Sequence, residues 1–257
     1  MPKLNMPSFP VNTEGEIEES AERARLHWGL GIDGPIDSMV DVLETAGVVL
    51  TVADSETAEK VDAFSRYGKT SVVVLNTAKG SSSHTFFDTA HEAAHGVLHY
   101  RQPVKPLDVR EKEAQRFAGS FLMPKRPFTR DFWSRGSVDF LNLLEMKAQW
   151  GTSLAAILVR VFQLKLIDAA VYRSAYKELS WRGWRTAEPE EPAPEFPKLF
   201  KLGLEQYEKN TKKGIEDFIA DTFLTPELFT SISGFVPPTT KTIGVMSLSE
   251  RLLERGG

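Results

Sequence analysis

Apolar residues recur at helical spacing over most of this chain. Between residues 14 and 29, Ile17, Ala21, Ala24 and Trp28 are three or four positions apart, with acidic residues early and arginines late. This pattern predicts a helix whose charges complement its dipole. The same spacing predicts further helices over 36–45, 110–123, 139–149, 153–163 and 168–179.

Two short β-branched runs interrupt the helical pattern. Residues 48–52 read Val-Val-Leu-Thr-Val and residues 71–76 read Ser-Val-Val-Val-Leu-Asn, and both predict strands. The second run comes just before a further helix that contains residues 91–95. This order suggests that the 71–76 strand offers an edge on which an extended peptide would bind as an additional strand.

Proline marks the boundaries of the predicted domains. The stretch 188–197 is rich in Pro and Glu and predicts a linker without regular structure. Before it, residues 1–187 are expected to form one domain, which includes a helix-turn-helix-like part at about 139–180. After it, residues 198–257 resume amphipathic spacing and predict a small helical C-terminal appendage.

The most informative motif is His91-Glu92-Ala93-Ala94-His95. Two imidazoles four residues apart on a helix point the same way, so both can bind one metal ion. The intervening Glu92 then lies beside the ion, where a carboxylate can act as general base toward water. This HExxH pattern is typical of zinc peptidases.

A catalytic zinc has three protein ligands and one position open to water, so a third ligand is needed. The predicted 110–122 helix offers Glu111 and Glu113. Glu113 is favoured because it directly precedes the inward-facing Ala114 and is four residues from Phe117, and Glu111 is the alternative. A solvated charge near a helix start is the competing interpretation of Glu113.

Two further residues flank the motif. His99 lies one turn along the same face, where it would hydrogen-bond a developing oxyanion, support a ligand from behind, or pack. Asp88, three residues before His91, would either orient that imidazole through its distal nitrogen or cap the helix.

Composition and charge limit which metal ligands and which partners are expected. The 257 residues include no Cys, so His and carboxylates are the available metal ligands. The net charge of −4 argues against general nucleic-acid binding, and the absence of a signal peptide or apolar span predicts a cytoplasmic protein. In the helix-turn-helix-like part, the second helix is mostly apolar. Arg160, with Thr152, Ser153 or Gln163, would have to read bases, so core packing is favoured.

Residues 86–99, FFDTAHEAAHGVLH, resemble the FTLAHELGHLLLH segment of the ImmA/IrrE family of zinc metallo-endopeptidases. Residues 113–124, EAQRFAGSFLMP, are similar to its EANxFAxxLLMP segment. The resemblance extends over roughly residues 15–230. It implies an α+β, zincin-like domain with a small sheet and an active-site helix, followed by a mainly helical region. It also implies that His91, His95 and Glu113 bind zinc and that Glu92 is the catalytic acid and base.

This chain departs from the family pattern at a few positions. Ala93-Ala94 replaces Leu-Gly, Gln115 replaces Asn, and Asp88-Thr89 replaces Thr-Leu. None of these changes removes a ligand.

Members of this family commonly cleave or inactivate an Xre-type helix-turn-helix repressor. The resemblance therefore implies control of a mobile-element, prophage, toxin–antitoxin or stress-response locus. No Xre domain is recognisable before the peptidase, so a separate repressor chain, encoded nearby, is the expected partner. A regulatory module that antagonises a repressor without cutting it is the first alternative, and a DNA-binding regulator is the second.

Overall fold

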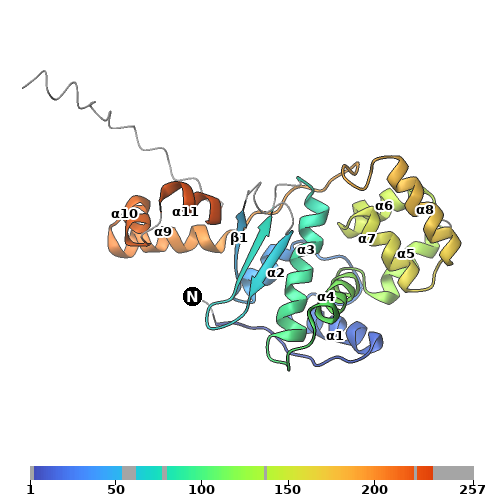
Figure 1. Cartoon of the computed structure of the whole chain (residues 1–257), viewed down its shortest axis with the longest axis horizontal. Coiled ribbons are helices and arrows are strands. Elements are labelled where there is room, and N and C mark those ends of the chain that lie inside the picture. The colour runs from blue at the N-terminus through green and yellow to red at the C-terminus, as the bar shows by residue number, and fades with distance from the viewer. Residues whose placement is uncertain (1–2, 54–61, 77–79, 136–137, 223–224, 234–257) are drawn as a thin grey trace, which may run out of the picture.

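A computed structural model describes residues 3–53, 62–76, 80–135, 138–222 and 225–233. The chain folds into a three-stranded sheet surrounded by helices, which confirms the predicted α+β class (Figure 1). The elements in order are α1 Glu14–His27, α2 Met39–Thr45, β1 Val49–Ala53, β2 Ala63–Arg66, β3 Val72–Asn76, α3 Ser82–Ala94, the π-helical turn η2 His95–His99, α4 Leu107–Leu122, α5 Lys125–Arg135, α6 Phe140–Trp150, α7 Leu154–Gln163, α8 Ala169–Trp181, α9 Leu199–Thr211, α10 Ile215–Thr222 and α11 Pro226–Ser233.

The sheet has the strand order β1-β3-β2. Strand β3 pairs in parallel with β1 and antiparallel with β2, so it is the central strand. The prediction that the 71–76 strand offers a free edge is therefore wrong. The edge strands are β1 and β2, and the short Ala-Phe-Ser-Arg sequence of β2 lacks a hydrophobic run and gave no strand signal.

Helix α3 is held between the sheet and α4, and α1 packs on the other side of α4. Buried Leu75 of β3, Ala90 and Ala94 of α3 and Phe117 of α4 belong to one continuous apolar core. Ser81 caps the start of α3, where its hydroxyl accepts from the backbone N–H of His84. Asp88 therefore lies inside the helix, and the expectation that it caps the helix is wrong.

The helix-turn-helix-like part turns its most polar helical side chain inward. Arg160 of α7 is 0% exposed, and its two terminal nitrogens donate to the Glu18 carboxylate at 2.6 and 2.8 Å. Its Nε donates to the carbonyl of Met123 at 2.9 Å. Thr152 and Ser153 are also buried. The favoured interpretation, core packing, is confirmed, and these three side chains are not placed to read base edges.

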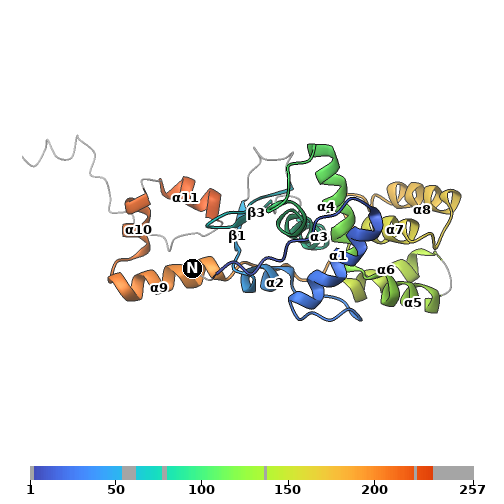
Figure 2. The same ribbon diagram turned by 90° about the horizontal axis from the view of Figure 1, so that it is seen from below.

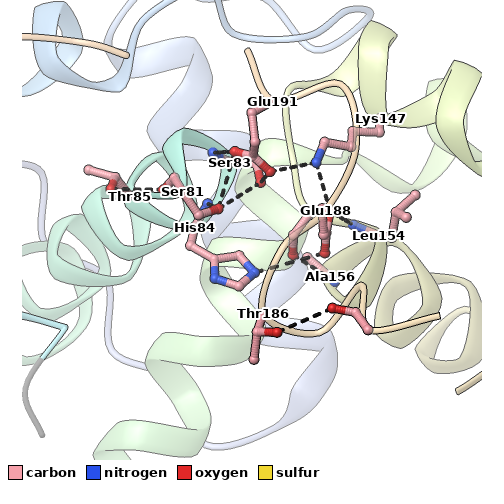
Figure 3. Close-up of polar contacts among 12 residues, drawn as sticks. Ser81, Ser83, His84, Thr85, Lys147, Leu154, Ala156, Thr186, Glu188 and Glu191 are labelled. Carbon is pink, nitrogen blue, oxygen red and sulfur yellow. Dashed lines mark hydrogen bonds and ion pairs between the residues drawn. The ribbon is translucent and has the colours of Figure 1, made fainter. Parts of the chain in front are cut away.

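Residues 186–198, here called the strap, run as irregular backbone from α8 to α9. Figure 3 shows that the strap is anchored by glutamates. Glu191 accepts from the backbone N–H of Ser83 at 2.9 Å, from its hydroxyl at 2.9 Å and from the Ser81 hydroxyl at 3.1 Å. Its carboxylate also pairs with Lys147 Nζ at 2.6 Å. The strap is thus bound to the first turn of the helix that carries the HExxH motif.

Two more glutamates of the strap bind helix starts. Glu188 accepts from the backbone N–H of Leu154 at 2.9 Å, at the start of α7, and pairs with Lys147 at 2.8 Å (Figure 3). Glu195 accepts from the N–H of Val40 at 2.9 Å, at the start of α2. Each carboxylate meets the unpaired N–H groups and positive dipole end of a helix.

Helices α9 to α11 lie at the end of the molecule opposite α5 to α8 (Figures 1 and 2). Both α9 and α11 contact β1, so they cover the sheet on the side away from β2. The predicted appendage is helical over its described residues, and its last predicted part, 234–257, lies outside them. In the described part of the chain, no helix is both long and apolar enough to cross a membrane.

Candidate metal centre

The two histidines of the motif and one carboxylate converge at the junction of α3, η2 and α4. His91 Nε2 and His95 Nε2 are 3.2 Å apart. Glu111 of α4 brings Oε2 to 3.1 Å from His91 Nε2 and Oε1 to 3.5 Å from His95 Nε2. Ligand atoms of His91, Glu92 and His95 also lie within 4.8 Å of one another.

These spacings fit a metal ion. Donor atoms that surround a tetrahedral ion with bonds of about 2.0–2.1 Å are about 3.3 Å apart. The three separations among His91, His95 and Glu111 range from 3.1 to 3.5 Å. Two imidazole nitrogens and a carboxylate are also the ligand types expected of such a site in a chain without Cys. The two imidazole nitrogens and the Glu111 carboxylate, which faces each histidine with a different oxygen, are therefore close enough together to bind one metal ion.

The structure places the predicted ligand Glu113 elsewhere. Its Oε2 lies 3.1 Å from His99 Nε2, and its Oε1 lies 2.6 Å from Lys105 Nζ. Both oxygens are thus engaged one turn of helix away from the His91–His95 pair. The alternative, Glu111, is the carboxylate that faces both histidines.

The environment of His95 favours its metal-binding form. Burial, with the nearby charges of His91, His99 and Arg110, lowers the pKa of His95 to about 3. The imidazole is therefore neutral at ordinary pH, and one ring nitrogen keeps a free lone pair.

Glu92 is 5% exposed and lies in the wall of the same site. Burial raises the pKa of its carboxyl, and the charge of Glu111 acts in the same direction. A hydrogen bond from Ser65 of β2 and the charge of His91 act in the opposite direction. The net increase makes Glu92 a stronger base than an exposed glutamate, which suits proton transfer near neutral pH.

Tyr67 packs closely against the backbone of the helix at Glu92 and Gly96. The Tyr67 hydroxyl donates to the carbonyl of Glu92 at 2.8 Å. A Cβ on Gly96 would lie 2.6 Å from Tyr67 Cζ and 2.9 Å from Met6 Cε. Glycine at 96 therefore lets the ring of Tyr67 lie against η2. The contribution of Tyr67, like that of Ser65, depends on the fold and has no signal in the sequence.

The site opens into a cavity of about 640 Å³. Its lining includes His91, Glu92 and His95 as well as the predicted Asp88 and His99. One side is formed by β2, where Phe64 is 57% exposed, and another by the loop before α4. Arg110 also lines the cavity, and its buried Nε has no hydrogen-bond partner among the described residues.

Two comparisons with known proteins bear on this site. A search of curated proteins finds no match to this chain. Residues 43–162 match the model of the Peptidase M78 family, described as the IrrE N-terminal-like domain. That range includes β1, β3, the HExxH motif and both candidate glutamates of α4. Residues 43–162 are thus similar to the IrrE N-terminal-like domain of this peptidase family, which confirms the predicted ImmA/IrrE resemblance.

Proposed function

We propose that this chain is a zinc-dependent endopeptidase of the gluzincin type. The observation that supports it best is the convergence of His91 Nε2, His95 Nε2 and the Glu111 carboxylate within 3.1–3.5 Å of one another, with Glu92 beside them. The proposal assigns the third ligand to Glu111 in place of the predicted Glu113. When bound, zinc would polarise the scissile carbonyl and lower the pKa of a water molecule.

Glu92 takes the role of general base and then general acid. Its carboxylate accepts the proton of the attacking water and passes it to the leaving amine. The raised pKa of Glu92 favours the first transfer, because a more basic carboxylate binds the proton more strongly. The Ser65 hydrogen bond acts against that increase and so favours the ionised carboxylate.

The substrate is expected to bind as an extended peptide along β2. This strand is the edge of the sheet nearest the site, and Ala63, Phe64 and Ser65 line the catalytic cavity. Main-chain hydrogen bonds to an edge strand hold an extended segment in register. The exposed ring of Phe64 offers an apolar contact, and Arg110 offers a donor to a substrate carbonyl.

We further propose a repressor of the Xre helix-turn-helix type, encoded nearby, as the protein partner in the cytoplasm. This part rests on the match of residues 43–162 to the Peptidase M78 family model. It would make the chain a regulator that removes repression by cutting the repressor. Direct binding to operator DNA is disfavoured, because Arg160 is committed to an internal ion pair with Glu18.

The test is co-expression of the chain with the adjacent repressor, comparing wild type with Glu92→Gln. The variant keeps the proposed zinc ligands and loses the base, so repressor fragments should appear with wild type alone. Glu178→Gln, a change at an exposed residue of α8, serves as the matched control and should cleave normally. Equal fragments with Glu92→Gln would refute the catalytic assignment. Relief of repression by both proteins without fragments would support a non-cleaving regulatory module instead.

A further inference from the structure

His95 has a second ring nitrogen, which points away from the proposed metal position. Its Nδ1 lies 3.0 Å from His99 Nδ1. A neutral imidazole carries one N–H, so a lone pair on Nε2 toward the metal requires the proton on Nδ1. His95 Nδ1–H would then donate to His99 Nδ1.

The position of the proton on His99 follows from this hydrogen bond. If its Nδ1 accepts, its Nε2 must carry the hydrogen, and that nitrogen lies 3.1 Å from Glu113 Oε2. The other oxygen of Glu113 accepts from Lys105 Nζ at 2.6 Å. Lys105 Nζ also donates to the carbonyl of Val11 at 2.5 Å. Each hydrogen bond thus has one donor and one acceptor, in an unbroken line from His95 to the N-terminal segment.

This line of hydrogen bonds, His95–His99–Glu113–Lys105, is shielded from water at its centre. The side chains of His99 and Glu113 are 6% and 12% exposed, so few water molecules compete for their hydrogen bonds. His95 and His99 both belong to the π-helical turn η2, in which the N–H of Tyr100 reaches back to the carbonyl of His95. π-Helical turns are rare and occur often at functional sites. Here the turn begins and ends on the two histidines that the line joins.

We propose that His99, Glu113 and Lys105 form a positioning chain that fixes the tautomer and ring orientation of His95 for metal binding. The inference rests on the proposed function, since it takes His95 as a ligand. In this inference Glu113 does not bind the metal but orients the ligand His95 through His99. A partner that accepts the distal N–H of a ligating histidine makes that histidine a better ligand, and its loss typically lowers metal affinity by about 10- to 100-fold.

The test is zinc affinity of the full chain, measured by competition with a chromophoric chelator, together with the absorption spectrum of the Co²⁺-substituted protein. Wild type should bind one ion. Glu113→Gln should bind one ion about 10- to 100-fold more weakly, with an unchanged Co²⁺ spectrum because the ligands are the same. Glu111→Gln should change the spectrum, since a ligand is lost. Glu178→Gln serves as the matched control and should match wild type in both readouts.

A second variant separates a positioning chain from general damage. His99→Phe should weaken zinc binding as Glu113→Gln does. The double variant should lose little more than either single variant, because the two residues act through one line. Thermal unfolding of each metal-free variant shows whether the fold is retained.

Three results would overturn the inference. The first is wild-type zinc affinity in Glu113→Gln. The second is a changed Co²⁺ spectrum in Glu113→Gln with an unchanged one in Glu111→Gln, which would make Glu113 the ligand. The third is multiplicative losses in the double variant. Failure of wild type itself to bind zinc or Co²⁺ would refute the proposed function as well, and is thereby distinguished from failure of the chain alone.

Discussion

The ion pairs between the strap and Lys147 allow a quantitative prediction of the stability of the fold. Lys147 of α6 is 0% exposed at its side chain, and its Nζ pairs with Glu188 at 2.8 Å and with Glu191 at 2.6 Å. Glu188 is itself 2% exposed. Replacing Lys147 with Met keeps most of the apolar volume and removes the charge. Two carboxylates would then remain close together, one of them buried without its cation.

Removing one partner of a buried ion pair costs about 3–5 kcal/mol, because the remaining charge is left uncompensated. In a chain of this size each kcal/mol shifts the midpoint of thermal unfolding by about 2–4 °C, so Lys147→Met should lower Tm by roughly 6–20 °C. The measurement is thermal unfolding followed by circular dichroism.

The control lies in the same strap. Lys198 pairs with Asp41 at 2.9 Å, but these side chains are 65% and 54% exposed. Lys198→Met should therefore leave Tm nearly unchanged. A decrease of less than about 2 °C for Lys147→Met, below the effect of 1 kcal/mol, would show that the strap contributes little and that the segment is a simple linker.

Two further substitutions and one pH dependence test other regions of the structure. Gly96→Ala should destabilise the fold by about 1–3 kcal/mol, because its Cβ would lie 2.6 Å from Tyr67 Cζ. Gly203→Ala, where a Cβ meets open space, should not destabilise, and equal urea midpoints for the two variants would contradict the packing argument. Although burial alone raises the pKa values of Glu18 and Glu191, the hydrogen bonds and charges of Arg160 and Lys147 lower them below 4.5. Their contribution to stability should be complete above pH 4.5 and lost as pH falls through the lowered values, whereas a flat urea midpoint over that range would contradict it. Phe64→Ala should lower kcat/KM for the repressor by about tenfold, the equivalent of about 1.4 kcal/mol of lost contact, with unfolding unchanged since Phe64 is exposed. An unchanged kcat/KM would argue against binding along β2.

Most helices were predictable because periodic apolar spacing reflects burial directly. The helix predicted over 153–163 is observed as Leu154–Gln163, and the 139–149 helix as Phe140–Trp150. Strand β2 and helix α5 were missed. Four residues of alternating exposure in β2 leave too short a pattern to recognise.

The site was predictable as far as the motif itself extends. Spacing within one helix places His91 and His95 on a common face, and the structure brings their Nε2 atoms to 3.2 Å. The choice between Glu111 and Glu113 depends on which of these two positions of α4 lies opposite the His91–His95 pair. That alignment is set by helix packing and by the π-helical turn, neither of which the spacing of apolar residues encodes.

The strap illustrates the same limit. Its prolines correctly indicated a segment without helix or strand. The glutamates between them gave no sign that they would bind the starts of α2, α3 and α7, because those helix ends are far away in sequence. Long-range pairing of this kind emerges only when the helices are assembled.

The most direct test of the proposed metal centre is the anomalous X-ray diffraction of zinc-soaked crystals at the zinc absorption edge. The proposed metal centre predicts one strong peak within bonding distance of His91 Nε2, His95 Nε2 and the Glu111 carboxylate, with Glu92 close by and unbonded. A peak bonded to Glu113 in place of Glu111, or no peak between His91 and His95, would contradict it.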